Sequence, residues 1–126
     1  MKANLDPRLD DITSIIIGAA FTVSNELGHG FLETVYKNAL MEELGAQRLS
    51  VSKEKSYPVI YRQKQIGQYI ADIVVENCVI VELKAADDLA QAHRAQLLNY
   101  LKASQLPVGL LFNFGRPKIQ VRRVIL

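Results

Sequence analysis

The sequence predicts an α/β protein with a mixed central sheet and helices on both of its faces. Two segments within the first 46 residues repeat apolar side chains every three or four positions, as amphipathic helices do. Later segments either alternate apolar and polar side chains or are apolar throughout, as strands are. The expected order is helix, helix, three strands, helix, strand, strand. A chain of 126 residues suits one domain, which we expect to span residues 1–126.

The first two elements are predicted to be helices. Residues 5–28 carry an apolar stripe, and Gly28 and Gly30 are expected to stop the helix. Residues 31–46 carry a second stripe, with Gly45 as the expected cap. The two stripes consist of Ile12, Ile15, Ile16, Ala19, Ala20, Val23 and Leu27, and of Leu32, Val35, Tyr36, Ala39, Leu40 and Leu44.

The remaining elements are three strands, a helix and two strands. The strands are expected at residues 51–63, 65–76 and 78–85, with a turn at Glu76-Asn77. Pro58 indicates that the first of them is an edge strand or contains a bulge, because proline cannot donate a ladder hydrogen bond. A helix is expected at residues 88–105, ahead of Pro107, and strands at 108–114 and 118–126.

The composition limits which cellular compartment and which binding partners can be expected. The net charge of +2 permits nucleic acid as a partner but does not require it. The single cysteine, Cys78, excludes an internal disulfide and any zinc or iron–sulfur site built on cysteines. The apolar run "IIIGAAF" is too short to span a membrane and follows no basic leader. We therefore expect a cytoplasmic protein without membrane contact.

Three of the charges in the stretch "ADIVVENCVIVELKAAD", residues 71–87, lie within its apolar runs, in the most apolar part of the chain. Asp72, Glu82 and Lys84 stand there among Ile, Val, Leu and Ala. Charged side chains are rarely buried unless they are paired. Strand alternation puts Glu82 and Lys84 on one face, and puts Asp72 on the same face as Val74.

Whether the two acids meet depends on the register of the hairpin. A three-residue loop at 76–78 places Asp72 opposite Glu82, and Asn77 tolerates the left-handed conformation that such loops need. A two-residue loop pairs Asp72 with Val81 and puts the acids on opposite faces. The sequence is compatible with both registers.

In the first register the two carboxylates repel each other by about 4 kcal/mol at ~4 Å and an effective dielectric of ~20. Lys84 would offset part of this repulsion and a bound divalent cation more. Hard oxygen ligands suit Mg²⁺ or Mn²⁺, and the backbone carbonyl of Leu83 could add one. The alternative is an ordinary ion pair at the rim of the sheet, against which the flanking apolar runs argue.

The spacing of these charges resembles a known signature. Asp72, nine intervening residues and Glu82-x-Lys84 are similar to the signature of the PD-(D/E)XK nuclease superfamily. Gln96 and Tyr100, one helical turn apart, resemble the Q-x-x-x-Y motif of its RecB-like branch.

A further motif resembles that of the GxxExxY protein family, which is assigned to the same superfamily. It consists of Gly30-x-x-Glu33-x-x-Tyr36, and the resemblance runs from about Ile12 to Val124. His29 stands where that family often has proline, and Ala71 stands where the superfamily nominally has one.

The resemblance implies a restriction-endonuclease-like core of αβββαβ order and a divalent-metal-dependent nuclease that acts on nucleic acid, with DNA favoured over RNA. Asp72, Glu82 and Glu33 would hold Mg²⁺ or Mn²⁺, with the Leu83 carbonyl as a further ligand. Lys84 would hold the attacking water or neutralise the phosphate. Gln96 and Tyr100 would orient the lysine, the metal or the scissile phosphate.

Each motif residue also has a structural interpretation. Glu33 could pair with Lys37 at i+4, and the tyrosines could be core aromatics with a wet hydroxyl. His29 suits a capping or surface position, whereas His93 shares a helix face with Gln96 and could border the site. The chain could equally be an accessory module that keeps the fold and acts through a partner. If the protein is a nuclease, its candidate contacts to the phosphate backbone are Lys53, Lys55, Lys118, Arg122 and Arg123. A nuclease of this size would be expected to act as a homodimer.

Overall fold

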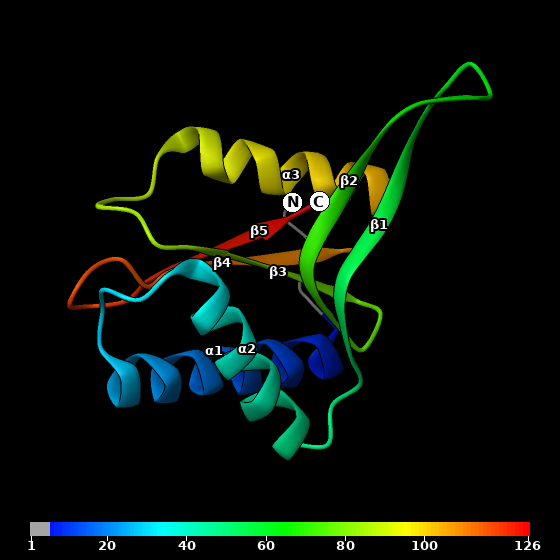
Figure 1. Ribbon diagram of the computed structural model, residues 1–126. Coiled ribbons are helices and arrows are strands. Elements are labelled where there is room, and N and C mark those ends of the chain that lie inside the picture. Colours follow the sequence, from blue (N-terminus) through cyan, green and yellow to red (C-terminus); the bar gives the residue numbers. More distant parts are fainter. Residues whose placement is uncertain (1–5) are drawn as a thin grey trace.

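A computed structural model describes residues 6–126 and contains a five-stranded sheet between helices (Figure 1). The elements follow the predicted order of two helices, three strands, a helix and two strands. They are α1 (Pro7–Leu27), α2 (Glu33–Ala46), β1 (Val51–Tyr61), β2 (Lys64–Val75), β3 (Val79–Lys84), α3 (Gln91–Ser104), β4 (Val108–Asn113) and β5 (Gln120–Ile125).

The helix ends agree with the sequence at one glycine and differ at another. Gly28 ends α1 with a φ of 69°, as predicted, whereas the expected start at residue 5 lies outside the described residues. The prediction that Gly45 caps the second helix is wrong, because α2 continues to Ala46. The left-handed residue beyond that end is Arg48, whose amide donates to the Gly45 carbonyl.

The strands lie in the sheet in the order β1-β2-β3-β4-β5. β3 and β4 run parallel and are joined through α3, while the other neighbouring pairs are antiparallel. Helices α1 and α2 pack on one face over the larger apolar core, and α3 packs on the other face over a smaller one (Figure 1). The predicted mixed sheet with helices on both faces is confirmed.

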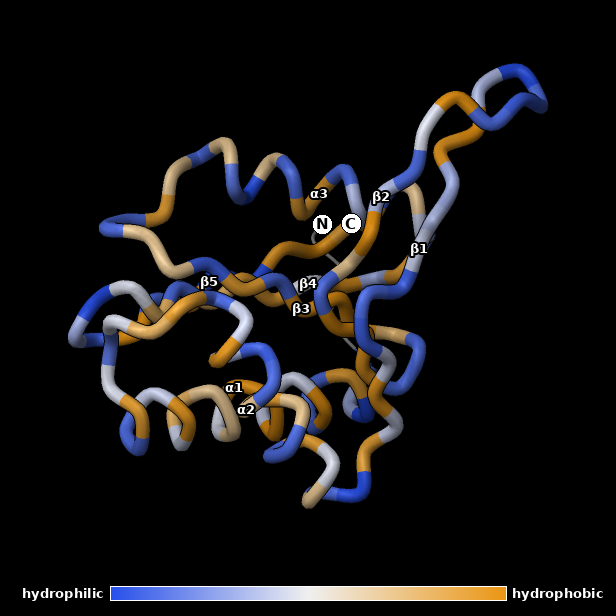
Figure 2. The backbone as a smooth tube through the Cα atoms, in the orientation of Figure 1, coloured by the Kyte–Doolittle hydropathy of each residue, from blue (hydrophilic) through white to orange (hydrophobic). Residues whose placement is uncertain are grey.

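The central strands are covered on both sides, which explains their continuous apolar sequence. Every residue of β4 is buried, as is every residue of β3 except Lys84, and Figure 2 shows both strands mainly in the colour of apolar residues. The two acids predicted to meet therefore lie next to the driest part of the molecule. Within residues 6–126, no helix combines the length and apolarity that crossing a membrane requires.

The β2–β3 hairpin has the three-residue loop. Its pairs are Val75 with Val79, Val74 with Ile80, and Ile73 with Val81. Glu76 and Asn77 take left-handed conformations, with φ of 52° and 53°. The two-residue alternative is therefore wrong, and extending the ladder by one step sets Asp72 across from Glu82. Both expectations for Pro58 are met as well, since β1 is an edge strand whose register shifts after Val59.

Strand alternation fails at Asp72. Ala71 and Val74 both belong to the core beneath α3, whereas Ile73 between them belongs to the opposite core. The ladder with β1 is interrupted at the same point: Glu54, the residue across from Asp72, is left out of the pairing and has a φ of 54°. Such irregularities re-aim side chains, so the expectation that Asp72 shares a regular face with Val74 is wrong.

The loop after β3 is fixed by one buried polar side chain, Asn113 at the end of β4. Its oxygen accepts from the amides of Ala86 and Gly115 at 2.9 and 3.0 Å, and its Nδ2 donates to the Ala86 carbonyl and to Gln120. A Cβ added at Gly115 would overlap the backbone of Ala86. This arrangement holds the segment that follows Lys84 against the end of β4.

Replacing Asn113 with alanine should destabilise the fold by about 2–4 kcal/mol, because it leaves buried backbone groups without partners and opens a cavity. The measurement is urea unfolding at neutral pH. The matched control is Asn99→Ala on the exposed side of α3, for which a change within about 0.5 kcal/mol is expected. Equal effects of the two substitutions would contradict the anchoring role of Asn113.

Candidate active site

The two predicted acids meet where β2 and β3 diverge. The Asp72 amide donates to Glu82 Oε2 at 2.8 Å, and the Leu83 amide donates to Asp72 Oδ2 at 2.9 Å. The regular ladder between the strands ends one residue earlier, at Ile73 and Val81. Each carboxylate thus replaces a strand carbonyl as the acceptor for the opposite strand, and the two acids are fixed by backbone hydrogen bonds.

Glu82 is almost completely enclosed, with 4% of its surface exposed. Burial, followed by the charge of nearby Asp72, raises the pKa of Glu82 to about 8; the Asp72 amide and Lys84 act in the opposite direction but do not outweigh it. Near neutral pH, this pair therefore holds a carboxyl group that is readily protonated and that favours any cation placed beside it.

One cation already lies beside the pair. Lys37 of α2 has its Nζ 3.4 Å from Asp72 Oδ1 and 3.5 Å from Glu54 Oε2. Burial by itself would lower the pKa of Lys37, but Asp72 and Glu54 together raise it. Lys37 is not among the site residues that the sequence predicts. Its only signal is its position one helical turn after Glu33 on the helix that covers this part of the sheet.

Lys84 is held by the helix on the other face of the sheet. Its Nζ donates to Gln96 Oε1 of α3 at 3.3 Å, so the expected proximity of Gln96 to the lysine is present. The Lys84 carbonyl accepts from Phe114 on the β4 side. Because successive carbonyls of a strand point to opposite edges, the Leu83 carbonyl faces β2, the side on which Asp72 lies.

Glu33 begins α2 and is exposed, but its pKa is affected by the same charged side chains that surround the acid pair. Partial burial, then Asp72, raises its pKa, while Lys84, Lys37 and the Ala85 amide lower it. Among the described residues, no three acidic, histidine or cysteine side chains converge closely enough to hold a metal ion. Asp72 and Glu82 are therefore brought together, and Glu33 lies at the border. The predicted i+4 pairing of Glu33 with Lys37 is absent from the ion pairs of residues 6–126.

Tyr100 lies next to the acids on the α3 side. Its ring packs against Tyr69 of β2 with centroids 4.8 Å apart, and it belongs to the smaller core. Burial, then the charges of Glu82 and Asp72, raise the pKa of Tyr100 to about 12. The phenol therefore stays protonated at neutral pH and remains a hydrogen-bond donor.

Tyr36 has a structural function in the loop before α2. Its hydroxyl donates to the Gly28 carbonyl at 2.7 Å and accepts from the Phe31 amide at 3.2 Å. The ring is fully buried and stacks on Phe114. Residues 28–31 are thereby held directly ahead of Glu33.

The histidines differ in their surroundings. His29 lines a recess shared with Glu33, Ala85 and Gly115, so it borders the acidic group. His93 accepts the Ala90 amide on its Nδ1 at 3.1 Å and thus caps the start of α3. The basic residues proposed for phosphate contact occupy both edges of the sheet: Lys53 and Lys55 are on β1, Arg122 and Arg123 on β5, and Lys118 precedes β5.

Comparisons with known proteins support the interpretation of the fold. A solved structure titled "Crystal structure of SSO0001" is similar, with a TM-score of 0.57 and 17% sequence identity; the match covers 92% of this chain and 58% of that one. This chain thus spans little more than half the length of that protein. A search of curated proteins found no match.

The sequence model described as "PD-(D/E)XK nuclease superfamily" matches residues 10–124, almost the whole chain. Nucleases of this superfamily generally use divalent metal ions. The matched region contains the β2–β3 fork and the helix that holds Lys84. The chain belongs to the PD-(D/E)XK nuclease superfamily.

Proposed function

We propose that this protein is a divalent-metal-dependent nuclease that hydrolyses phosphodiester bonds, in DNA rather than RNA. The observation that carries the proposal is the β2–β3 fork, where two acids are locked by backbone hydrogen bonds beside an oriented lysine. A structural module has no need for two adjacent acids, one buried and one partly buried, since their repulsion costs stability.

The donor chemistry suits a hard cation. Asp72, Glu82 and the Leu83 carbonyl would hold Mg²⁺ or Mn²⁺, with Glu33 bound directly or through water. When bound, the ion lowers the pKa of a coordinated water and polarises a phosphoryl oxygen. The raised pKa of Glu82 supports this assignment, because burial and then the charge of Asp72 disfavour the carboxylate, and a bound cation would offset both effects.

Lys84 would act on the reacting groups, as the side chain that holds the attacking water or neutralises charge on the phosphate. Gln96 restrains the ammonium through their hydrogen bond and would serve as a positioning residue. Tyr100, which stays protonated, would donate its hydroxyl toward the phosphate or the acids. Lys37 would compete with the metal for Asp72 while the site is empty of substrate.

We also propose membership of the GxxExxY family within the RecB-like branch. Two contacts support it. Tyr36 binds the loop around Gly30, which has a φ of 114°, so the glycine and tyrosine of the motif act together to place Glu33. Gln96 and Tyr100 lie on the same side of α3, one beside Lys84 and the other beside the acids.

The accessory module remains the second candidate, and Lys37 is the observation that favours it. Its ammonium already pairs with Asp72, which allows the fold to tolerate the acids without a metal. Isothermal titration with Mn²⁺ separates the two functions: binding at the fork supports the enzyme, whereas no binding at millimolar Mn²⁺ supports the module.

Lys84→Ala should reduce cleavage by about two to three orders of magnitude while the fold and metal binding persist, because a group that acts mainly in the transition state is removed. The assay uses single-stranded, double-stranded and branched DNA and RNA with Mg²⁺, Mn²⁺ or EDTA. Arg48→Ala, which removes an exposed charge after α2, is the control expected to cut normally. Cleavage by Lys84→Ala at the wild-type rate would attribute the activity to a contaminant.

Lys37→Met should strengthen Mn²⁺ binding by about tenfold, because the competing cation beside Asp72 is lost while the aliphatic packing is kept. Titration calorimetry measures the change, and Arg48→Met provides the control for charge alone. Unchanged or weaker binding in Lys37→Met would show that Lys37 does not compete with the metal.

Glu82→Gln should remove a pH-dependent loss of stability in metal-free buffer. Since the folded-state pKa of Glu82 is raised, its stabilising contribution is complete below about pH 4.5 and is lost as the pH rises through about 8. The loss should amount to roughly 3–5 kcal/mol. Thermal melts in EDTA between pH 5 and 8 should therefore fall more steeply for wild type than for Glu82→Gln.

Glu42→Gln, at an exposed position on α2, is the matched control and should follow the wild-type profile. If Glu82→Gln followed that profile as well, Glu82 would not be the group responsible. Adding Mn²⁺ at pH 8 should restore wild-type stability but not that of Glu82→Gln.

A further inference from the structure

The β1–β2 hairpin extends well beyond the body of the molecule (Figure 1). We define the arm as residues 56–70, from Ser56 to its partner Ile70. The helices do not cover its outer end, where Ile60 and Ile66 are 57% and 64% exposed. An exposed apolar surface on a projecting ribbon needs a partner to cover it.

The arm differs in charge from the rest of the chain. It contains Arg62 and Lys64 and no acidic residue, so all 13 Asp and Glu side chains lie outside it. Outside the arm, the 13 other Lys and Arg residues balance those acids, and the arm therefore carries the entire formal charge of +2. Neither Arg62 nor Lys64 takes part in an ion pair among the described residues.

We propose that the arm binds in a groove of double-stranded DNA next to the active site. The inference rests on the proposed nuclease function and names its substrate class. A two-stranded ribbon fits the major groove of B-form DNA, which is about 12 Å wide. Arg62 and Lys64 then face phosphates, while Ile60 and Ile66 can contact thymine methyl groups.

The arm is directly connected to the site, because it continues the strand that carries Asp72. Arg62 lies ten residues before Asp72, which corresponds to about 30 Å of strand, somewhat less than one turn of B-form DNA. At the base of the arm, Tyr69 packs on Tyr100, which lies beside the two acids. A duplex cut at the fork would thus meet the arm within one helical turn.

The tip of the arm fits this role. Arg62 and Gln63 form the two-residue turn with φ of 49° and 67°, which places Arg62 at the apex of the hairpin. The ladder skips Ile66, because Ile60 pairs with Gln65 while Val59 pairs with Gly67. This bulge twists the ribbon and leaves Ile66 without a cross-strand partner.

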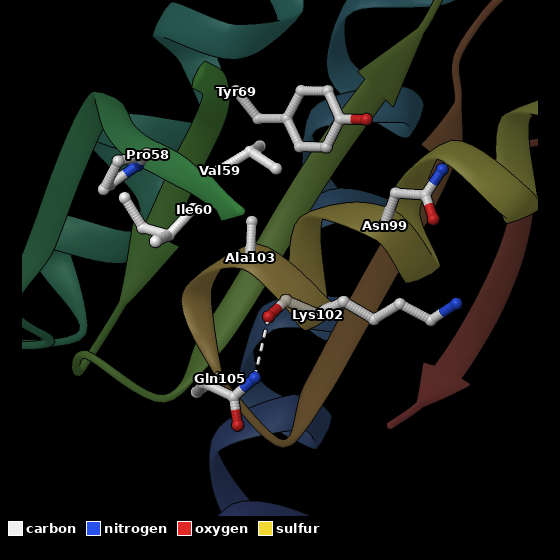
Figure 3. Close-up of a pocket in the computed structure, with 8 residues that line it drawn as sticks. All are labelled: Pro58, Val59, Ile60, Tyr69, Asn99, Lys102, Ala103 and Gln105. Carbon is white, nitrogen blue, oxygen red and sulfur yellow. Dashed lines mark hydrogen bonds between the residues drawn. The ribbon is translucent and has the colours of Figure 1, made fainter. Parts of the chain in front are cut away.

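The flank of the arm is also free of negative charge. A groove of about 510 Å³ separates it from the end of α3 (Figure 3), and no acidic side chain is among the residues that line it. Lys102 lines this groove from the α3 side, and its side chain extends past Asn99 (Figure 3). A phosphate backbone beside the arm would therefore meet another cation.

Two other occupants fit less well. Edge-to-edge pairing with a second copy is disfavoured by Lys53, Lys55 and Pro58 on β1 and by the bulge, which are features that blunt sheet edges. Single strands need several exposed aromatic platforms on which successive bases stack. The arm offers one, Tyr61, which is 56% exposed and has Arg62 over its ring at 5.2 Å, whereas Tyr57 and Tyr69 are half-buried toward α3. A-form RNA offers a major groove too narrow to admit the ribbon.

The test measures binding separately from cleavage, in EDTA, with fluorescent 20-base-pair DNA, the same sequence as duplex RNA, and single-stranded DNA, from 50 to 300 mM salt. Replacing both Arg62 and Lys64 with glutamine should make the negative slope of log K against log salt shallower by about 1.8, since each lost phosphate contact removes about 0.9 from its magnitude. Affinity for duplex DNA at 0.1 M salt should fall at least tenfold.

The control removes two charges from exposed positions outside the arm, Arg48→Gln with Arg94→Gln, and should bind as wild type. A third variant, Lys118→Gln with Arg122→Gln, examines the opposite edge of the sheet. A loss confined to that variant, equal binding of duplex RNA, or an arm variant that changes only the oligomeric state in sedimentation would overturn the proposal.

Cleavage assays with Mg²⁺ then separate the two proposals. Arm-dependent duplex binding without any cleavage would keep the arm's role and reject the nuclease. Normal cleavage and normal duplex binding by the Arg62→Gln, Lys64→Gln variant would keep the nuclease and reject the arm.

Discussion

The exchange of hydrogen bonds between Asp72 and Glu82 is the constraint on which the rest of the site depends. Two strands that separate leave backbone amides without partners, and the two carboxylates accept these amides in place of strand carbonyls. The acids thus end the ladder and hold the fork open at the same time. Their geometry follows from the backbone itself, so it does not rely on flexible side-chain contacts.

The two acids place negative charge next to the buried central strands, and side chains from the surrounding elements partly compensate it. Lys37 approaches Asp72 from α2, while Lys84 lies on the strand that carries Glu82 and is held by Gln96 of α3. Helices on opposite faces of the sheet therefore supply positive or polar groups to the same pair. Burial and the charge of Asp72 still raise the pKa of Glu82. A cation bound beside the two acids would stabilise the Glu82 carboxylate, and this stabilisation would contribute to its affinity.

Two loops around the acid pair are also held in place by buried side chains. Asn113 ties the segment after Lys84 to β4, and Tyr36 ties the glycine loop to the helix that begins with Glu33. Both anchors are buried polar side chains with their hydrogen bonds satisfied. In contrast, the arm packs on the body of the molecule mainly through Tyr57 and Tyr69, and its outer end is exposed, as expected of a segment that is completed by its ligand.

The order of the elements could be predicted from the sequence, because periodicity and turn chemistry act over a few neighbouring residues. The i+4 spacing likewise put Gln96 and Tyr100 on one side of α3. The sequence allowed two registers for the hairpin, and the structure decided for the three-residue loop that sets Asp72 across from Glu82. Tertiary structure alone decided that Lys37 pairs with Asp72 and Glu54 instead of Glu33, since those partners come from distant strands. It also decided the break in alternation at Asp72 and the projection of the arm. Those features depend on how β1 pairs with β2 and on where the helices stop covering the sheet. No pattern among neighbouring residues contains this information.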